Sequence, residues 1–199
     1  MSINFNGKIK ILYQTPKQFD ALIDSKKITE VGVYPNYSIH NMVTSPYPKG
    51  SRYANTCSIV SINDSMVHLA PEQRGRDFVQ KLVDFLKKEK AEKGDVTAFV
   101  MGGKSGDIES ENLFYEIGNL LEKFNANFSM IGLKNSKSAK GLDALAKNGD
   151  TFVFTQEYNP ELAKVVKENK SLTSEELQKI FERFYDYIEI SPNHKIING

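Results

Sequence analysis

Residues 57–70 read Cys-Ser-Ile-Val-Ser-Ile-Asn-Asp-Ser-Met-Val-His-Leu-Ala, and the predicted arrangement of the strands follows from them. Two β-rich runs, 57–62 and 66–70, flank an Asn-Asp-Ser segment that is typical of turns. The pattern therefore predicts a tight β-hairpin. It also places the single cysteine of the chain, Cys57, and one of its three histidines, His68, on neighbouring strands.

The register of this hairpin determines whether Cys57 and His68 can meet. With Asn63-Asp64 as a two-residue turn, Ile59 lies opposite His68, and Cys57 falls on the same face of the sheet. The two Cβ atoms are then diagonal neighbours, about 7 Å apart, within reach of an imidazole. A three-residue loop would reverse the parity and separate the two side chains.

A cysteine beside a histidine suits nucleophilic catalysis, because the imidazole takes the thiol proton and the thiolate attacks. Ordinary packing accounts for the same residues: Cys57 as a small buried hydrophobic side chain and His68 as a core or surface histidine. Both interpretations stay open at the level of residue spacing.

Elements of both kinds follow the hairpin. Apolar periodicity and turn residues predict a helix over 74–90, a strand over 96–101 stopped by Gly102-Gly103, a helix over 109–124 and a strand over 128–133. This alternation predicts an α/β or α+β layered fold, in which helices pack on a mixed β-sheet or sandwich.

The flanking segments are predicted from weaker patterns. We expect strands over 8–13 and 151–155, a short helix over 16–27, an irregular segment over 31–50 and a polar loop over 134–140. Thr173 and Glu176 have the spacing of a capping box, which predicts the start of a further helix. Apolar residues at helical spacing continue this predicted helix through Ile188.

Length and charge narrow the class of protein. The chain has 199 residues, which suits a single domain over 1–199. With 26 Lys+Arg against 25 Asp+Glu, it lacks the basic excess of a nucleic-acid binder. One cysteine excludes an internal disulfide framework and a thiolate-rich zinc site. No apolar run reaches the roughly 20 residues of a membrane span, and the first residues lack a signal-peptide pattern. We therefore expect a cytoplasmic protein without a membrane span.

The segment from Cys57 through Gly103 resembles the CheD family of chemotaxis receptor deamidases and, more distantly, the catalytic fold of the cytotoxic necrotizing factor toxins. In that family a strand carries the nucleophilic Cys and the next strand carries a His in an Ala-His-x-Met-Leu-Pro-like context. In this chain, the segment that corresponds to the His-bearing strand of the family is Val67-His68-Leu69-Ala70-Pro71. A helix, a strand and a Gly-Gly turn follow in the family's order, and Asn112 matches the Asn of its next helix. The resemblance makes 50–155 the catalytic core and 156–199 a helical extension.

The resemblance implies a cysteine-dependent glutamine deamidase that acts on a protein substrate, with a thioester intermediate and no cofactor. Cys57 would be the nucleophile and His68 the base. The family has a Thr six residues before its Cys, where Ser51 stands here; Ser51 or Thr56 would orient the imidazole. The Gly-rich turn that precedes the family's Cys is replaced by Tyr53-Ala-Asn-Thr. If an amine replaced water, the same site would catalyse transglutamination.

Two other functions fit these residues. His40, Cys57 and His68 could ligate zinc, as in the YfiH-type laccase-domain proteins, which act on small molecules. The second of these functions is that of a CheD-like protein that has lost its activity and only binds a partner. The segments outside the core also fit a secreted effector without a cleavable signal, as an alternative to a cytoplasmic protein.

Overall fold

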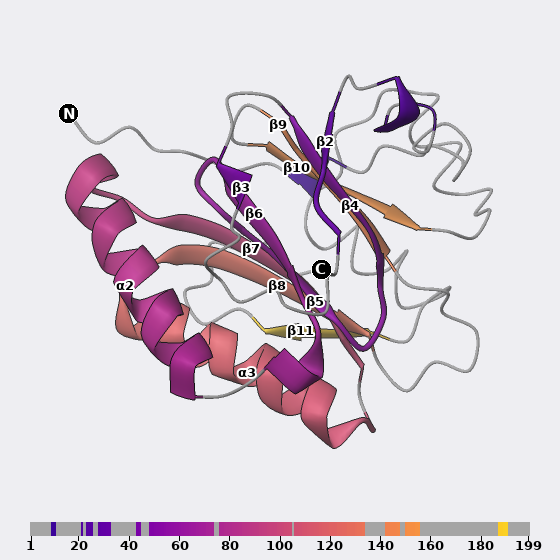
Figure 1. The fold of residues 1–199 in the computed structure, drawn as a ribbon. Coiled ribbons are helices and arrows are strands. Elements are labelled where there is room, and N and C mark those ends of the chain that lie inside the picture. The colour runs from indigo at the N-terminus through magenta and orange to yellow at the C-terminus, as the bar shows by residue number, and fades with distance from the viewer. Residues whose placement is uncertain are drawn as a thin grey trace.

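The computed structural model describes the following residues: 9–10, 21, 23–25, 28–32, 43–44, 48–73, 76–104, 106–133, 142–147, 150–155 and 187–190. Within them the strands form two sheets, and two long helices cover one of these sheets (Figure 1). The architecture is α+β, as the order of predicted elements indicated.

The larger sheet has six strands and contains the predicted hairpin. Its order is β11 (Tyr187–Ile190), β8 (Asn127–Leu133), β7 (Thr97–Lys104), β5 (Ser58–Ile62), β6 (Ser65–Leu69) and β3 (Val43–Thr44). The sheet is mixed, because β7 and β8 are parallel whereas β5 is antiparallel to both β6 and β7. Ile62 pairs with Ser65 and Ile59 with His68, which confirms the two-residue turn and the predicted register.

Polar contacts fix the hairpin turn to the elements beside it. Asn63 has a left-handed φ of 48°, a conformation that asparagine tolerates better than most residues. Its Nδ2 donates to Glu89 Oε2 at 2.8 Å, and its Oδ1 accepts from the Thr97 N–H at 3.0 Å. Lys93 Nζ lies 2.7 Å from Asp64 Oδ2. These contacts hold the turn at one position along the sheet, so they also fix the register of the strands.

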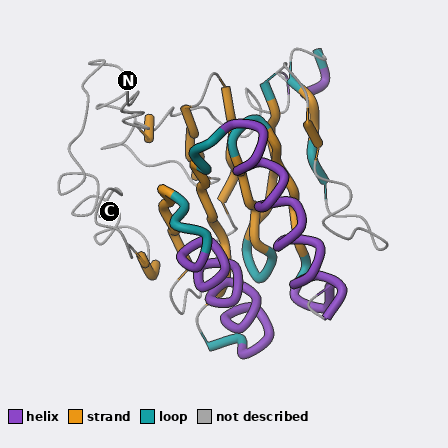
Figure 2. Tube along the Cα trace, turned by 90° about the vertical axis from the view of Figure 1, so that its left-hand side faces the viewer, coloured by secondary structure: helices purple, strands orange, loops and turns teal. Residues whose placement is uncertain are grey.

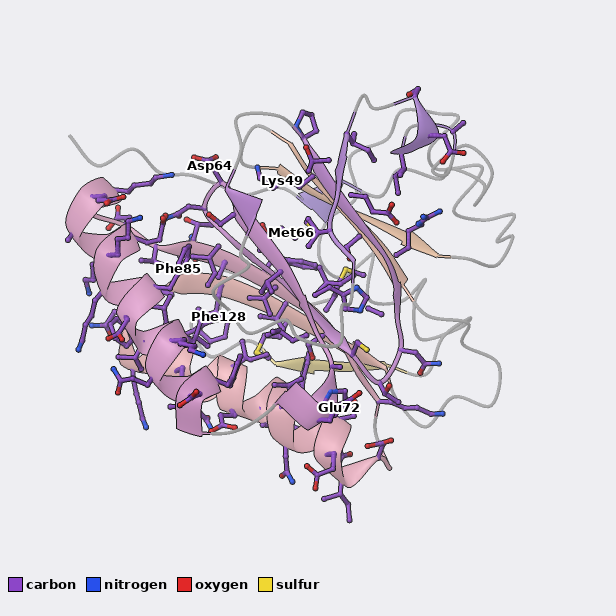
Figure 3. The ribbon with its side chains drawn as sticks, in the orientation of Figure 1. Lys49, Asp64, Met66, Glu72, Phe85 and Phe128 are labelled. Carbon is purple, nitrogen blue, oxygen red and sulfur yellow. The ribbon has the colours of Figure 1, made fainter. Side chains whose placement is uncertain are left out.

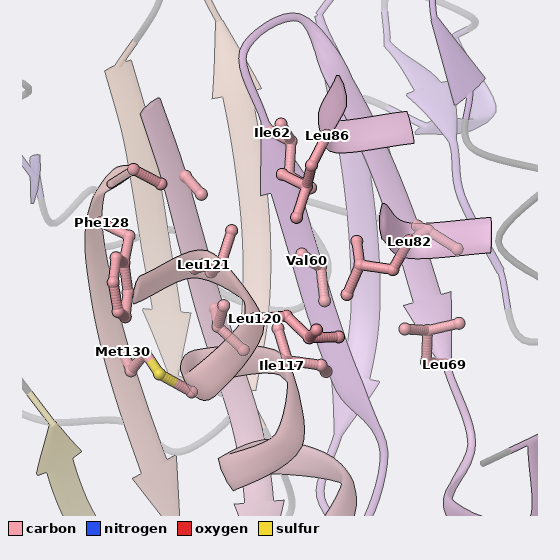
Figure 4. Close-up of a cluster of buried hydrophobic side chains, with 14 of the residues drawn as sticks. Val60, Ile62, Leu69, Leu82, Leu86, Ile117, Leu120, Leu121, Phe128 and Met130 are labelled. Carbon is pink, nitrogen blue, oxygen red and sulfur yellow. The ribbon is translucent and has the colours of Figure 1, made fainter. Parts of the chain in front are cut away.

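Helices α2 (Arg76–Lys93) and α3 (Ile108–Lys123) pack on one face of the six-stranded sheet (Figure 2). Their apolar stripes match the predicted helices at 74–90 and 109–124. Between the helices and the sheet lies a core of buried side chains (Figure 4): Val60, Ile62, Val67, Leu69, Leu82, Leu86, Val100, Leu113, Ile117, Leu121, Phe128 and Met130. The strand residues that alternate with these, including Ile59 and His68, therefore point away from the helices.

The second sheet covers that opposite face. Its order is β1 (Ile9–Lys10), β10 (Asp150–Thr155), β9 (Leu142–Lys147), β4 (Lys49–Ala54) and β2 (Thr29–Glu30). Strand β4 packs against β5, β6 and β7, so three layers follow one another: helices, six-stranded sheet, five-stranded sheet (Figure 1). Every residue of β5 and β6 is buried, because both faces of this hairpin are covered.

Several predicted boundaries need correction. The segment 31–50 is not irregular throughout, since it contains β3 and the start of β4. Strand β7 continues through Gly102-Gly103 to Lys104 instead of stopping there. Strand β9 was not predicted. Ile188 lies in strand β11, not in a helix, because this segment pairs antiparallel with β8.

Other predictions concern residues only partly described. Ile9–Lys10 is the described part of the strand predicted over 8–13, and Ala21, Ile23 and Asp24 are helical within 16–27. The capping box at Thr173 and Glu176, the loop over 134–140 and most of the extension over 156–199 lie outside the described residues. Among the helices of the described residues, none has the length and apolar character needed to cross a bilayer.

Candidate active site

His68 lies in the layer between the two sheets. It sits on β6 opposite Ile59 and is 3% exposed. Its neighbours along the strand, Val67 and Leu69, belong to the core under the helices, so the imidazole points to the five-stranded sheet. Burial lowers the pKa of His68 from 6.5 to about 4, because an apolar environment disfavours the charged ring. The imidazole is therefore neutral at pH 7.

Ser51 on β4 reaches the imidazole from the other sheet. Its Oγ lies 2.9 Å from Nδ1 of His68, and both residues are buried. The Ser51 hydroxyl also donates a hydrogen bond to the carbonyl oxygen of Val31. Ser51 was one of the two residues expected to orient the ring, and the structure brings it into contact with His68. Thr56, the other, makes no hydrogen bond to the imidazole.

The second ring nitrogen of His68 has no partner among the residues that the structure describes. Nε2 is buried and, within the described part of the chain, forms no hydrogen bond. A buried polar atom without a partner costs about 1–3 kcal/mol, so such atoms are rare and each one requires an explanation, of which a catalytic role is one. Cys57 is among the described residues, and its thiol is therefore not hydrogen-bonded to Nε2. Cys57 immediately precedes β5 and His68 lies on β6, and no hydrogen bond joins their side chains.

Cys57 immediately precedes β5, at the end of the hairpin away from the turn. The Gly103 N–H donates to its carbonyl oxygen at 3.1 Å, which continues the pairing of β5 with β7 by one residue beyond Ser58. Cys57 is intermediate in exposure, so it is not enclosed in the core as the strand residues after it are.

Burial raises the pKa of the Cys57 thiol, since a thiolate is poorly solvated there. A hydrogen bond with the Thr56 side chain acts in the opposite direction, and the carboxylate of Glu72 raises the pKa further. Glu72 lies on the 3-10 helix η2 (Pro71–Gln73), far from Asp64 at the turn (Figure 3). Cys57 is thus a thiol at pH 7, and no thiolate–imidazolium pair forms between Cys57 and His68 at rest.

The start of α3 holds the segment before Cys57. Ser110 Oγ donates to the Thr56 carbonyl at 2.6 Å and accepts from the Lys104 N–H at 2.6 Å. Asp107 caps the helix by accepting from the Ser110 N–H at 3.0 Å. The sequence analysis did not identify Ser110 as a residue of the site. The only sequence signal for this role is a small polar residue at the start of a helix, which is common.

The zinc hypothesis involves a residue that the structure does not describe. His40 lies outside the described residues, so its distance from Cys57 and His68 is not defined. Within the described ranges, no group of three or more His, Cys, Asp or Glu side chains is arranged to hold a metal ion.

A comparison of the chain with protein-family models finds no match, and a search of curated proteins finds none either. The geometry of Cys57, His68 and Ser51 therefore carries the functional argument.

Proposed function

We propose that the chain is a cysteine-dependent deamidase that converts a glutamine side chain of another protein to glutamate. The observation that carries this proposal is the state of His68: one ring nitrogen is held by Ser51, and the other is buried and has no partner among the described residues. This is the arrangement that a general base requires, because the free nitrogen has a lone pair for a proton. Cys57, the proposed nucleophile, immediately precedes the neighbouring strand β5.

In the first half of the reaction, the Cys57 sulfur attacks the carboxamide carbon of the glutamine. Both Cys57 and His68 are neutral at rest, so the thiol proton moves to Nε2 as the S–C bond forms. The resulting oxyanion needs a hydrogen-bond donor, and the Cys57 N–H is the nearest candidate along the chain. His68 then gives its proton to the departing nitrogen, the C–N bond breaks, and ammonia leaves a thioester.

In the second half, water hydrolyses the thioester. Nε2 of His68 takes a proton from the attacking water, the C–S bond breaks, and the sulfur recovers the proton from His68. The product is a carboxylic acid, so glutamine plus water gives glutamate plus ammonia. Cys57 and His68 return to their neutral starting states.

Ammonia release tests the proposal. Benzyloxycarbonyl-glutaminyl-glycine and unfolded β-casein present glutamine in a peptide and in a protein, and mass spectrometry locates the converted residue. Cys57→Ala and His68→Gln are expected to lower the rate at least about 100-fold, the size of a general-base contribution. Ser58→Ala is the matched control, because Ser58 is adjacent and buried and its hydroxyl has no partner among the described residues. It should retain the wild-type rate.

Other outcomes identify the alternatives. Ammonia release that persists in Cys57→Ala would contradict the proposal. Stoichiometric zinc in the purified protein, lost in Cys57→Ser, would instead support a zinc site of His40, Cys57 and His68. A folded, metal-free protein that releases no ammonia from either substrate would favour a binding protein.

A further inference from the structure

The outer side of helix α3 carries two exposed apolar side chains. Ile108 is 72% exposed and Tyr115 is 40% exposed, and among the residues that the structure describes these are the large hydrophobic side chains that remain exposed. They are seven residues apart, which is about two helical turns, so both point to the same side of the helix. With α2, α3 forms the outer layer of helices (Figure 2), and its buried residues face the sheet. Single exposed apolar residues are common, but two aligned on one helix mark a surface that a partner can bury.

Two asparagines complete a heptad pattern on this side of α3. Asn112 lies four residues after Ile108, and Asn119 lies four residues after Tyr115. This alternation of four and three residues is the spacing of the contact positions in a coiled coil. Asn112 is half-buried and Asn119 is exposed. An asparagine at a contact position weakens the pairing of two helices but fixes its register, because the amide needs a polar partner. We call Ile108, Asn112, Tyr115 and Asn119 the α3 stripe.

Glutamates flank the α3 stripe on both sides. By the helical spacing, Glu109 and Glu116 lie along one edge and Glu111 lies along the other. These are the positions at which coiled coils form ion pairs between their helices. The sequence of α3 holds four glutamates and one lysine, whereas the whole chain has 26 Lys+Arg against 25 Asp+Glu. The helix is therefore acidic in a chain whose charges are otherwise balanced.

The Tyr115 ring is held in place before any partner binds. It contacts the buried ring of Phe114 edge to face, with the ring centroids 5.9 Å apart and an interplanar angle of 79°. A side chain that is already restricted loses less freedom in a complex, so Tyr115 is suited to anchor one.

We propose that the α3 stripe is a docking site for a helix of another protein. This helix presents apolar side chains to Ile108 and Tyr115, and lysine or arginine side chains to the flanking glutamates. The spacing of the stripe favours a helix over an extended segment, because the contact positions recur every three or four residues along α3. Two heptads make a short interface, and the asparagines weaken it further, so the complex is transient. The inference stands apart from the proposed deamidase activity.

Charge makes a second copy of α3 an unsuitable partner. In a parallel pair of α3 helices, Glu111 of one copy would face Glu116 of the other. In an antiparallel pair, each edge would face the same edge of the other copy, and glutamates would again meet glutamates. Like charges that face one another across an interface oppose binding. The stripe therefore suits a basic helix and not its own copy.

A synthetic peptide of about three heptads tests this docking on the full chain. The peptide carries leucine and asparagine at its contact positions and lysine at both flanking positions, and a second peptide carries glutamate at those flanking positions. Fluorescence anisotropy measures binding, and circular dichroism measures the helicity that the peptide gains. We expect the lysine peptide to bind, to become helical and to shift the amide NMR signals of α3. We expect the glutamate peptide not to bind. Failure of the lysine peptide to bind, or equal binding of both peptides, would overturn the proposal.

Variants locate the contact. Ile108→Ser and Tyr115→Ser should each weaken binding of the lysine peptide at least about fivefold, the size expected when an interface anchor is truncated. The double variant Glu109→Lys, Glu116→Lys should reverse the preference, so that the glutamate peptide binds better. Glu92→Lys is the matched control, because it makes the same charge change at an exposed position of α2 and should leave the preference unchanged. Urea unfolding checks that every variant is folded.

Two outcomes of these experiments would contradict the docking site. The first is binding of the lysine peptide that neither Ile108→Ser nor Tyr115→Ser weakens in a folded protein. The second is a dimer of the wild-type chain, detected by sedimentation, that Ile108→Ser dissociates, because the stripe would then bind a second copy of the chain.

Discussion

Gly102 approaches the Cys57 carbonyl so closely that a Cβ atom at position 102 would lie 2.0 Å from its oxygen. Gly102 also has a φ of +113°, which residues with a side chain rarely adopt. The neighbouring Gly103 has a φ of +66° and donates the hydrogen bond to the same carbonyl. The two glycines let β7 pass close to the candidate nucleophile and hold its backbone.

Gly102→Ala is therefore expected to displace Cys57 and to destabilise the fold by about 3 kcal/mol, because the neighbouring atoms are backbone and cannot move aside easily. Urea unfolding measures the stability. Gly94→Ala is the matched control: Gly94 also has a positive φ, +79°, but nothing lies within 4 Å of its added Cβ. It should cost only about 1–2 kcal/mol. Equal losses for the two variants would show that the close approach to Cys57 has no energetic weight.

Glu72→Gln is expected to lower the pKa of the Cys57 thiol. The Glu72 carboxylate opposes formation of the thiolate, so its neutralisation removes part of the upward shift. The rate of alkylation by iodoacetamide, followed from pH 6 to pH 10, gives the pKa. Glu122→Gln removes the same charge at the other end of α3, where the side chain is exposed, and should leave the profile unchanged. A Cys57 profile that does not move in Glu72→Gln would rule out this electrostatic coupling.

Acid should destabilise the protein through His68. The pKa of this ring is about 4 in the folded state against an ordinary 6.5, so between these values the unfolded chain binds the extra proton. Stability is therefore complete above pH 6.5 and declines as the pH falls toward 4, by about 3 kcal/mol at 1.36 kcal/mol per pKa unit. Urea titrations at several pH values measure this slope. His68→Gln should flatten it in this window, and a slope unaffected by the substitution would mean that other groups cause the acid sensitivity.

Asn63→Ala should weaken the turn that sets the hairpin register. The substitution removes the donor to Glu89, a carboxylate that is 4% exposed, and the acceptor for the Thr97 N–H. We expect a loss of about 2–3 kcal/mol, since charged and buried groups lose partners. Asn63→Gly separates the effects, because glycine adopts the φ of 48° freely yet lacks the side-chain bonds. A wild-type midpoint for Asn63→Gly would show that these bonds contribute nothing.

The elements that the sequence predicted well are those that local patterns define. The hairpin over 57–70 followed from Asn63-Asp64 between two β-rich runs, and its parity correctly placed Ile59 opposite His68. Strand β5 begins at Ser58, one residue after Cys57. Helices α2 and α3 followed from apolar residues at helical spacing. Both signals depend only on residues close together in the chain.

The missed features depend on residues far apart in the chain. Strand β9 reads Leu-Asp-Ala-Leu-Ala-Lys, a composition that favours helix, and it becomes a strand because it pairs with β10 and β4. The Gly102-Gly103 pair was predicted to end the strand. Strand β7 continues through both residues, because the Gly103 N–H pairs with the Cys57 carbonyl oxygen. The hydrogen bond of Ser51 to Val31 involves a main-chain oxygen, which carries no sequence signal. Ser51 itself was predicted to be a site residue only because of the family resemblance.

Adjacent residues of the β5–β6 hairpin point to opposite faces of the six-stranded sheet. One set packs in the core beneath the helices: Val60, Ile62, Val67 and Leu69. Ile59 and His68 lie instead in the layer between the two sheets. The six-stranded sheet thus separates the outer surface of α2 from the His68 imidazole. Affinity tags, fluorophores or fusion partners could be attached to that surface without reaching the layer between the two sheets.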